Sequence, residues 1–361
     1  MTALRIAIGV VLILVFGGDA VDTLVSTRVR SGRWWPNTVF YRWTWHRYRW
    51  LAGRVRSAGV RESLLSIYGP GSLLALLAIW VSGQIVGWGF IWWALGGSFA
   101  PALRSIGDGI YFSGVAFFTV GFGDLLPRSG VARALTLTEA MMGLGTIGLV
   151  IGYLPSLYGA YQAREREILL LDDLTDSRIT PGTLLRSWIG PERDLSKMDA
   201  QFERWTEWCA DVYSSHSSFP MLTLFRSQHR GHSWVTALGV VTDAAMATIA
   251  TLPGADRGPA MRLYRQSCRA ITDLAAQVGV PPKVVEPMGS RFWSLGYASW
   301  QLMVDDIHSF EESYRRLLEL RTDFTPWMEA FIDALDAPRG IWGVTASEHL
   351  READLGSTIF E

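Results

Sequence analysis

Six consecutive residues, Thr119-Val-Gly-Phe-Gly-Asp124, have the types and spacing that would present a row of backbone carbonyls to a cation. To pass a potassium ion, a protein must replace the ion's hydration water with oxygen atoms held at close quarters, and carbonyls from four copies of one segment provide them. Gly121 and Gly123 suit this task because aiming successive carbonyls at one axis requires backbone angles that only glycine adopts at low cost. The carbonyls expected to bind the ion are those of Thr119, Val120, Gly121 and Phe122.

Side chains at the two ends of this segment extend the same chemistry. Thr119 adds a hydroxyl at the inner end, and four copies of Asp124 would concentrate cations at the outer mouth. The preceding residues, Asp108–Phe118, predict half a membrane helix that is capped by Asp108 and directs the partial negative charge of its C-terminal end toward a central cavity. Non-helical backbone is tolerated at membrane depth only where it is buried in protein or lines a water-filled path. The pattern therefore predicts a re-entrant pore helix followed by a selectivity filter.

Two long uncharged stretches flank the filter and its half-helix. Residues 63–103 and 140–163 contain no charged side chain, and each is longer than the roughly 20 residues that cross a bilayer core. They predict membrane-spanning helices near Gly71–Leu95 and Val131–Tyr161. Three tryptophans toward the end of the first span are expected to form an aromatic belt at the membrane interface. These are Trp88, Trp92 and Trp93.

The filter string between two spans resembles the pore module of two-transmembrane potassium channels of bacterial type, whose signature is Thr-Val-Gly-Tyr/Phe-Gly-Asp. The resemblance covers about Tyr68–Gln162. It implies an all-α membrane protein in which a transmembrane helix, a re-entrant pore helix with its filter, and an inner helix conduct potassium as a homotetramer. A fourfold pore also requires four subunits because each chain carries one filter. Gly143 matches the family's gating hinge in its distance from Asp124, and Pro155 is expected to kink the inner helix where a lower gate would lie.

The sequence also departs from the family pattern around the filter. Phe118 stands where many members have a second threonine, and Phe122 replaces the commoner tyrosine, so a hydroxyl that could brace the filter against the pore helix is absent. Tyr111 and Phe112 lie where an aromatic cuff usually stands. Potassium selectivity remains the expectation. The alternatives are a weakly selective cation channel and a non-conducting signalling or scaffold protein that retains a pore-like fold.

Glu139 is the one carboxylate in the second predicted span, and an ionisable residue inside a membrane is a functional candidate. It follows the filter by about four helical turns and is expected to back the pore helix. Two interpretations stand side by side, a carboxylate that tunes the filter and a hydrogen-bonded structural acid. The nearby string Gly143-Leu-Gly-Thr-Ile-Gly148 fits a dinucleotide-binding pattern, but it lies inside a membrane helix with no preceding strand, which excludes a nucleotide site.

The N-terminal apolar stretch Ile6–Gly18 fits either the core of a signal peptide or a first membrane span. A first span, near Leu4–Val25, is favoured because short arginine-rich loops stay in the cytoplasm. The expected protein is then a multi-pass protein of the plasma membrane, with its N-terminus and the Gly97–Arg133 region outside and its C-terminal half in the cytoplasm. The arginines that follow the first span without an intervening acid are Arg28, Arg30, Arg33, Arg42, Arg47, Arg49, Arg54, Arg56 and Arg61.

This basic loop is also rich in tryptophan. Arginine mixed with tryptophan suits a segment that lies on anionic lipid of the inner leaflet, so membrane lipid is an expected partner. The alternative is a topology determinant with aromatic anchors. Nucleic acid is not expected as a partner because the loop is tied to the membrane at both ends. The tryptophans are Trp34, Trp35, Trp43, Trp45 and Trp50.

Charge divides the chain into two halves. Residues 1–161 contain 13 Arg, no Lys and 6 acidic residues, a balance of +7, whereas the remaining 20 of 33 basic and 28 of 34 acidic residues give −8. We expect four segments: an N-terminal transmembrane helix (1–27), a basic aromatic cytoplasmic segment (28–66), a potassium-channel pore domain (67–162) and a helical cytosolic regulatory domain (163–361). Ala163–Asp172 is expected to continue the inner helix as a coupling helix.

The C-terminal half predicts an all-α domain, since alternating strands are scarce, and not the nucleotide-binding regulatory module common on bacterial potassium channels. Trp234–Leu252 is apolar enough for a fourth span, but Asp243 at its centre favours a buried bundle helix. The helical patterns cover Lys197–Tyr213, Trp234–Leu252, Pro259–Val278, Ser290–Arg321 and Pro326–Leu335.

Other chemistry is weakly indicated. His216, His229 and His232 are interpreted as surface or loop histidines and not as a zinc site. Cys209 and Cys268 lack the close spacing of a metal or disulfide framework. No nucleophile–base pattern predicts an enzyme. Neither a metal nor a cofactor is expected beyond potassium as the permeant ion, and no ligand of the C-terminal domain can be identified from the sequence.

Overall fold

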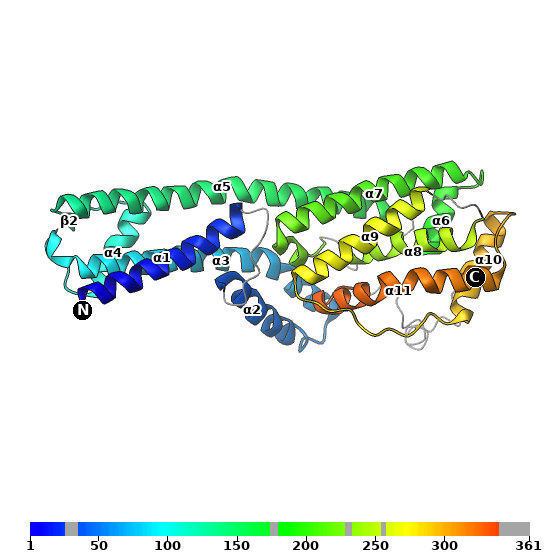
Figure 1. The fold of residues 1–361 in the computed structure, drawn as a ribbon, viewed down its shortest axis with the longest axis horizontal. Coiled ribbons are helices and arrows are strands. Elements are labelled where there is room, and N and C mark those ends of the chain that lie inside the picture. The colour runs from blue at the N-terminus through cyan, green and yellow to red at the C-terminus, as the bar shows by residue number, and fades with distance from the viewer. Residues whose placement is uncertain (26–34, 174–179, 228–232, 254–257, 339–361) are drawn as a thin grey trace. The chain divides into compact units, whose positions relative to one another are not determined.

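A computed structural model describes residues 1–25, 35–173, 180–227, 233–253 and 258–338 (Figure 1). The chain divides into two compact units, Met1–Gly159 and Ala160–Glu361, which are treated separately below. Helices dominate both units, so the fold class is the expected all-α one. Arg28, Arg30, Arg33, Trp34, His229 and His232, singled out above, lie outside the described residues.

The first unit contains three helices that are long and apolar enough to cross a membrane. These are α1 (Thr2–Val25), α3 (Ala58–Ala94) and α5 (Gly130–Asp173), the last of which continues into the second unit. α3 and α5 both extend beyond the predicted spans because their polar ends remain helical after the hydrophobic signal stops. A fourth helix, α2 (Pro36–Ala52), lies within the basic segment, for which no helix was predicted.

Glycines let α1 and α3 approach each other closely. A Cβ on Gly9 would lie 2.5 Å from the carbonyl oxygen of Gly87, and a Cβ on Gly83 would lie 2.3 Å from the ring of Phe16. Small residues at such crossings allow the van der Waals contact that holds membrane helices together, since lipid provides no hydrophobic drive between them. α1 is thereby packed along α3 as an integral helix of this unit (Figure 1).

The predicted tryptophan belt is wrong for two of its three members. Trp88 and Trp92 are buried inside the unit, where Trp92 packs edge-to-face on Phe99 and Phe112 with ring centroids 5.6 and 5.3 Å apart. Only Trp93 is partly exposed. The sequence counts tryptophans near a helix end, but it does not say which side of the helix faces the protein.

Short elements fix the region around the filter. A 3₁₀ turn, η1 (Gly96–Ser98), leads into strand β1 (Phe99–Ala100), which pairs antiparallel with β2 (Leu126–Pro127) beyond the filter. Between the two strands lies the pore helix α4 (Ile106–Phe117). Its N-cap is Ser105 and not Asp108 as predicted; Asp108 is the reciprocal member of a capping box and accepts from the Ser105 backbone N–H at 2.9 Å.

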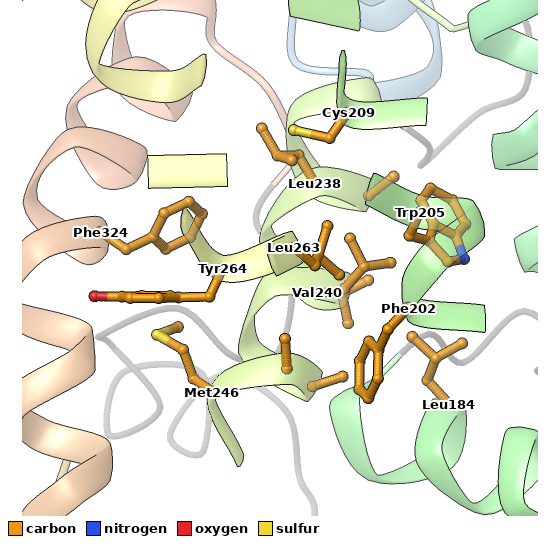
Figure 2. Close-up of a cluster of buried hydrophobic side chains, with 14 of the residues drawn as sticks. Leu184, Phe202, Trp205, Cys209, Leu238, Val240, Met246, Leu263, Tyr264 and Phe324 are labelled. Carbon is orange, nitrogen blue, oxygen red and sulfur yellow. The ribbon is translucent and has the colours of Figure 1, made fainter. Parts of the chain in front are cut away.

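The second unit is a helical bundle formed by the end of α5 and six further helices of the described chain. They are α6 (Pro181–Ile189), α7 (Leu195–Ser218), α8 (Trp234–Thr251), α9 (Gly258–Gln277), α10 (Ser290–Met303) and α11 (Phe310–Leu335), with a 3₁₀ turn η2 (Pro220–Leu224) after α7. Figure 2 shows Phe202 of α7, Leu238 of α8, Leu263 of α9 and Phe324 of α11 meeting in one apolar cluster.

α8 lies within the core of this bundle. Although its hydropathy would allow it to cross a membrane, 89% of it is buried inside the unit. Asp243 at its centre is paired with Arg321 of α11 at 2.5 Å, and both side chains are buried. A buried ion pair of this kind leaves no exposed charge for lipid to solvate, and the helix belongs to the bundle as the sequence indicated.

Two predicted helix boundaries in this unit are wrong. The pattern over Ser290–Arg321 is broken between α10 and α11, and Pro326 lies inside α11 instead of starting a helix. Phe324 and Met328, on either side of Pro326, are both buried in the core. Tertiary packing of these side chains therefore keeps the helix continuous despite the hydrogen bond that proline cannot donate.

Candidate functional site

The filter backbone alternates in handedness. Thr119, Gly121 and Gly123 have φ of 55°, 64° and 80°, whereas Val120 and Phe122 do not have positive φ. Regular helices and strands keep φ negative at every residue, so this alternation sets the segment apart from both geometries. Within the described residues, no backbone hydrogen bond is accepted by the carbonyls from Thr119 to Gly123. These oxygens remain available to another ligand.

The start of the filter is held on the pore helix through its N–H groups. Thr119 N–H donates to the carbonyl of Ala116 at 3.0 Å, and Val120 N–H donates to that of Val115 at 2.9 Å. The backbone N–H groups of Thr119 and Val120 thus have hydrogen-bond partners within the chain, whereas their carbonyl oxygens have no backbone partner among the described residues. Extending the hydrogen-bonded turn of α4 in this way fixes the direction in which the filter leaves the helix.

Positive φ at Thr119 was not predicted. A left-handed backbone costs a non-glycine residue roughly 1–2 kcal/mol, so the surrounding structure must hold it in place. Strained residues of this kind concentrate at functional sites. The signal in the sequence was the regular spacing of Thr119, Gly121 and Gly123, but threonine type alone gives no indication of a positive φ.

Phe122 has no hydroxyl to brace the filter, but another residue on the pore helix provides one. The Tyr111 hydroxyl on α4 donates to Oδ2 of Asp124 at 2.9 Å and joins the pore helix to the outer end of the filter. Phe112, the next residue, is buried against Phe99 of β1 with ring centroids 4.7 Å apart. The pore helix therefore carries one hydrogen-bonding aromatic toward the filter and one apolar aromatic toward the core.

Glu139 lies at the meeting point of three helices. Its carboxylate accepts from Nε1 of Trp92 on α3 at 2.7 Å and from the Ser113 hydroxyl on α4 at 2.5 Å, and it is fully buried. Glu139 thus backs the pore helix, as its spacing from the filter suggested. Trp92 and Ser113 were not predicted as its partners, because only the fold brings α3 and α4 together around it.

Gly143 is in direct contact with the C-terminal end of the pore helix. A Cβ at this position would lie 2.0 Å from the carbonyl oxygen of Phe117, far inside van der Waals contact. Gly145 and Gly148 on the same helix have nothing within 4 Å of such a Cβ. α5 is helical through both Gly143 and Pro155. Gly143 therefore has a steric role in seating α4, separate from any role as a hinge.

The C-terminal end of α5, which was predicted to be cytoplasmic, belongs to the second unit. The buried side chain of Arg164 holds it there. The Arg164 guanidinium donates to the carbonyls of Leu222 and Phe225 at 3.1 and 2.8 Å and pairs with Glu165 at 2.8 Å. Its own carbonyl accepts from Nε1 of Trp208 on α7 at 3.2 Å. Residues 160–173 of α5 are thus an integral helix of the bundle.

His216 faces the same arginine and is completely buried, so its prediction as a surface or loop histidine is wrong. Nη1 of Arg164 lies 3.1 Å from Nε2 of His216, and Nδ1 lies 2.8 Å from the carbonyl oxygen of Val212. Since a guanidinium can only donate, Nε2 accepts and Nδ1 carries the proton. Burial, and secondarily the charge of Arg164, lower the pKa of His216 well below its usual value. The imidazole is therefore neutral. Among the described residues, no group of three His, Cys, Asp or Glu side chains could hold a metal ion.

Comparison with known proteins supports an ion channel domain within the first unit. Residues 76–158 match the ion channel family. The matched segment runs from α3 through the pore helix and filter into α5 and contains every filter residue. The apolar helices and this match together identify an all-α membrane protein with an ion channel domain.

A longer similarity links the chain to a bacterial membrane protein. The uncharacterized membrane protein YdjJ of Bacillus subtilis (strain 168) is 28% identical over 200 residues, which cover 54% of this chain and 58% of that protein. The similarity thus spans little more than half of the length of that relative. No solved structure matches the chain.

Proposed function

We propose that the protein is a potassium-selective channel that conducts as a homotetramer through the filter Thr119–Asp124. The observation that carries this proposal is the alternating backbone of Thr119, Gly121 and Gly123, whose carbonyls have no acceptor role within the described chain. Four such segments around one axis would supply rings of carbonyl oxygens that could replace the hydration shell of a potassium ion.

The exposed surface of α5 supports assembly into an oligomer. Large apolar side chains along this helix are exposed in the single chain, including Met141 at 75% and Leu137 at 68%. Lipid would cover one side of such a helix, while a fourfold arrangement would cover another and leave a third to line the pore. One filter in each chain requires this arrangement for conduction.

The experiment that tests the proposal is ion flux from the purified protein in liposomes, with reversal potentials measured between potassium and sodium. Gly121→Ala should abolish or de-select the flux, because alanine at a φ of 64° strains the backbone. Gly114→Ala is the matched control, since Gly114 lies in α4 and a Cβ there would meet nothing within 4 Å.

Three results would argue against the proposal. Selective flux that is unchanged by Gly121→Ala would remove the filter assignment. Equal permeability of potassium and sodium in the wild-type protein would leave a weakly selective cation channel. Tetramers that assemble but pass no ion would leave a signalling or scaffold protein with a pore-like fold.

Glu139 is proposed to tune the filter from behind. Its hydrogen bond to Ser113 reaches the pore helix four residues before Phe117, so a change in its charge acts next to the start of the filter. In Glu139→Gln, the amide oxygen can accept from Trp92 and the amide nitrogen can donate to Ser113, which preserves both contacts and removes only the charge. A tuning role predicts an altered open-state lifetime or pH response in intact tetramers. Identical currents in both proteins at every pH would leave a structural acid.

We further propose that the helical second unit lies in the cytoplasm and gates the pore. The support is that α5 is one helix from Gly130 to Asp173 and that its final residues are anchored in the bundle by Arg164. A ligand that favours one arrangement of the bundle would bias the inner helix by its differential affinity for the two states.

A further inference from the structure

Helix α2 has one side fixed against α3. Thr44 Oγ1 lies 2.8 Å from the Tyr68 hydroxyl, and the Tyr48 hydroxyl donates to the carbonyl of Leu64 at 2.8 Å. The ring of Trp45 packs on that of Tyr68 with centroids 4.9 Å apart. These contacts recur at helical spacing, so they determine which face of α2 is turned away from the protein.

The opposite face combines cationic and large apolar side chains. Trp43 and Trp50 are 60% and 59% exposed and lie two helical turns apart. The exposed residues recur as neighbouring pairs every four positions and form one stripe, which we call the Arg/Trp face. It consists of Arg42, Trp43, His46, Arg47, Trp50, Leu51 and, just beyond the helix, Arg54.

Two arginine–tryptophan stacks organise this face. The guanidinium carbon of Arg47 lies 4.3 Å from the ring centroid of Trp43, and that of Arg54 lies 3.5 Å from the ring centroid of Trp50. Stacking occupies the faces of these guanidinium groups and leaves their in-plane N–H donors free to bind an anion. The sequence contains no acidic residue from Pro36 to Arg61. Within the described residues, Arg42, Arg47 and Arg54 have no carboxylate partner.

The Arg/Trp face is held near the ends of two apolar helices. Asp19 of α1 accepts from the backbone N–H of Asn37 at 3.0 Å and from Nε1 of Trp80 of α3 at 2.6 Å. The Asn37 side chain also donates to Thr23 of α1 at 2.9 Å. α2 therefore begins beside the C-terminal end of α1, where a membrane-crossing helix reaches the headgroup region.

From these observations we infer that the Arg/Trp face binds the headgroups of anionic phospholipids. Tryptophan rings favour the interfacial layer of a bilayer, where an apolar body and a polar N–H are both accommodated. Arginine donors bind phosphate in a bidentate manner. A water-exposed face would leave two large indole rings uncovered, and an acidic protein partner would satisfy the arginines without requiring tryptophans next to membrane-spanning helices. The inference depends on the membrane placement of α1 and α3 and not on potassium conduction.

The test measures lipid retention and not current. The full-length protein is placed in nanodiscs that contain phosphatidylcholine and phosphatidylglycerol, and the lipids retained after transfer to detergent are counted by native mass spectrometry. The triple variant Arg42→Gln, Arg47→Gln, Arg54→Gln should lose its preference for phosphatidylglycerol. At about 1 kcal/mol per arginine, three arginines correspond to roughly a hundredfold change in affinity.

A matched triple variant removes the same charge elsewhere. Arg166, Arg193 and Arg269 lie in the second unit with side chains 74%, 56% and 70% exposed, and their replacement by Gln should leave lipid retention unchanged. Trp43→Ala with Trp50→Ala should weaken retention at unchanged charge. Equal retention of phosphatidylglycerol by the wild type and the first triple variant would overturn the inference. Equal loss in both triple variants would also overturn it, because net charge and not this face would then attract the lipid.

Discussion

At the scale of single residues, Gly143 gives the sharpest test of how the pore helix is held. Gly143→Ala is expected to displace the end of α4, because the added methyl group would lie 2.0 Å from the carbonyl oxygen of Phe117. The first filter residues are hydrogen-bonded to the same turn of α4. Ion flux should therefore fall at least tenfold or become non-selective. Liposome flux measures the effect, and detergent chromatography shows whether tetramers persist.

Gly145→Ala distinguishes seating from hinge flexibility. Both substitutions favour the helical conformation of α5 by about 1 kcal/mol, because alanine has a higher helix propensity than glycine. A Cβ on Gly145, however, would meet nothing within 4 Å. A steric role predicts that only Gly143→Ala impairs conduction. If the two variants gate abnormally to the same extent, helix flexibility would explain the effect and the contact with Phe117 would not matter.

His216 makes the stability of the second unit depend on pH. Its pKa in the folded state lies well below the value of 6.5 that it has when exposed. Between these two pKa values the unfolded chain binds a proton that the folded chain does not. The contribution of His216 to the free energy of unfolding is therefore largest above about pH 6.5, and it is lost as the pH falls from 6.5 toward the folded-state pKa. The protection of the α7 amides against hydrogen exchange, measured relative to their intrinsic exchange rate at each pH, should fall over that range in the full-length protein. His216→Gln should flatten this part of the profile; an identical acid slope in both proteins would show that other groups cause it.

The residue types in the string 119–124 predicted its unusual backbone but not the groups around it. Unusual backbone angles were expected at Gly121 and Gly123 because glycine adopts positive φ at low cost, and the structure has them at 64° and 80°. Tyr111 as the brace of Asp124, and Trp92 as a donor to Glu139, required knowledge of which helices meet. Contacts between residues far apart in sequence leave no periodic signal.

At the scale of elements, hydropathy located the long apolar helices well, but it did not show which of their faces are buried in the protein. α1, α3 and α5 each overlap one of the three predicted spans, because an apolar stretch of this length has few alternatives, and α3 and α5 continue beyond them. α2 was missed because its apolar residues are aromatic and its other face is arginine, which resembles an interfacial loop as much as a helix. The burial of Trp88 and Trp92 could not be predicted, since α3 is apolar on all sides.

The orientation of these elements in the membrane is a prediction that labelling can check. Ser57 is exposed between α2 and α3, and the basic segment around it is expected on the cytoplasmic side. A cysteine at this position should resist an impermeant thiol reagent in whole cells and react after permeabilisation. A cysteine at Ser98, in the turn before β1, should show the opposite pattern. Labelling of Ser57→Cys in intact cells, with a cytosolic control protected, would reverse the topology.

At the scale of the whole molecule, one continuous helix belongs to both compact units. The boundary between the units falls after Gly159, within α5. Residues 163–172, expected from the sequence to be a coupling helix, are already part of the second unit. A flexible linker inserted after α5 would therefore leave the anchor of the inner helix intact, and the decisive position is Arg164.

Arg164→Lys tests whether this anchor transmits force or only supports folding. Lysine keeps the charge beside Glu165 but lacks the planar fork that reaches the carbonyls of Leu222 and Phe225. Arg164→Ala would instead leave Glu165 buried without its partner at a cost of about 3–5 kcal/mol, which threatens the fold of the unit. The milder variant should speed hydrogen exchange in residues 160–173, preserve tetramers, and change the open probability in single-channel records.

Arg166→Lys provides the control for that experiment, because Arg166 lies on the same helix with its side chain 74% exposed. An exposed arginine contributes little to the rigidity of the bundle, so this variant should match the wild type in hydrogen exchange and gating. A unit that only promotes assembly predicts a different outcome for Arg164→Lys, namely fewer tetramers with normal gating in those that form. Faster exchange in residues 160–173 together with wild-type open probability would refute mechanical coupling, since the anchor would then be loosened without any effect on the pore.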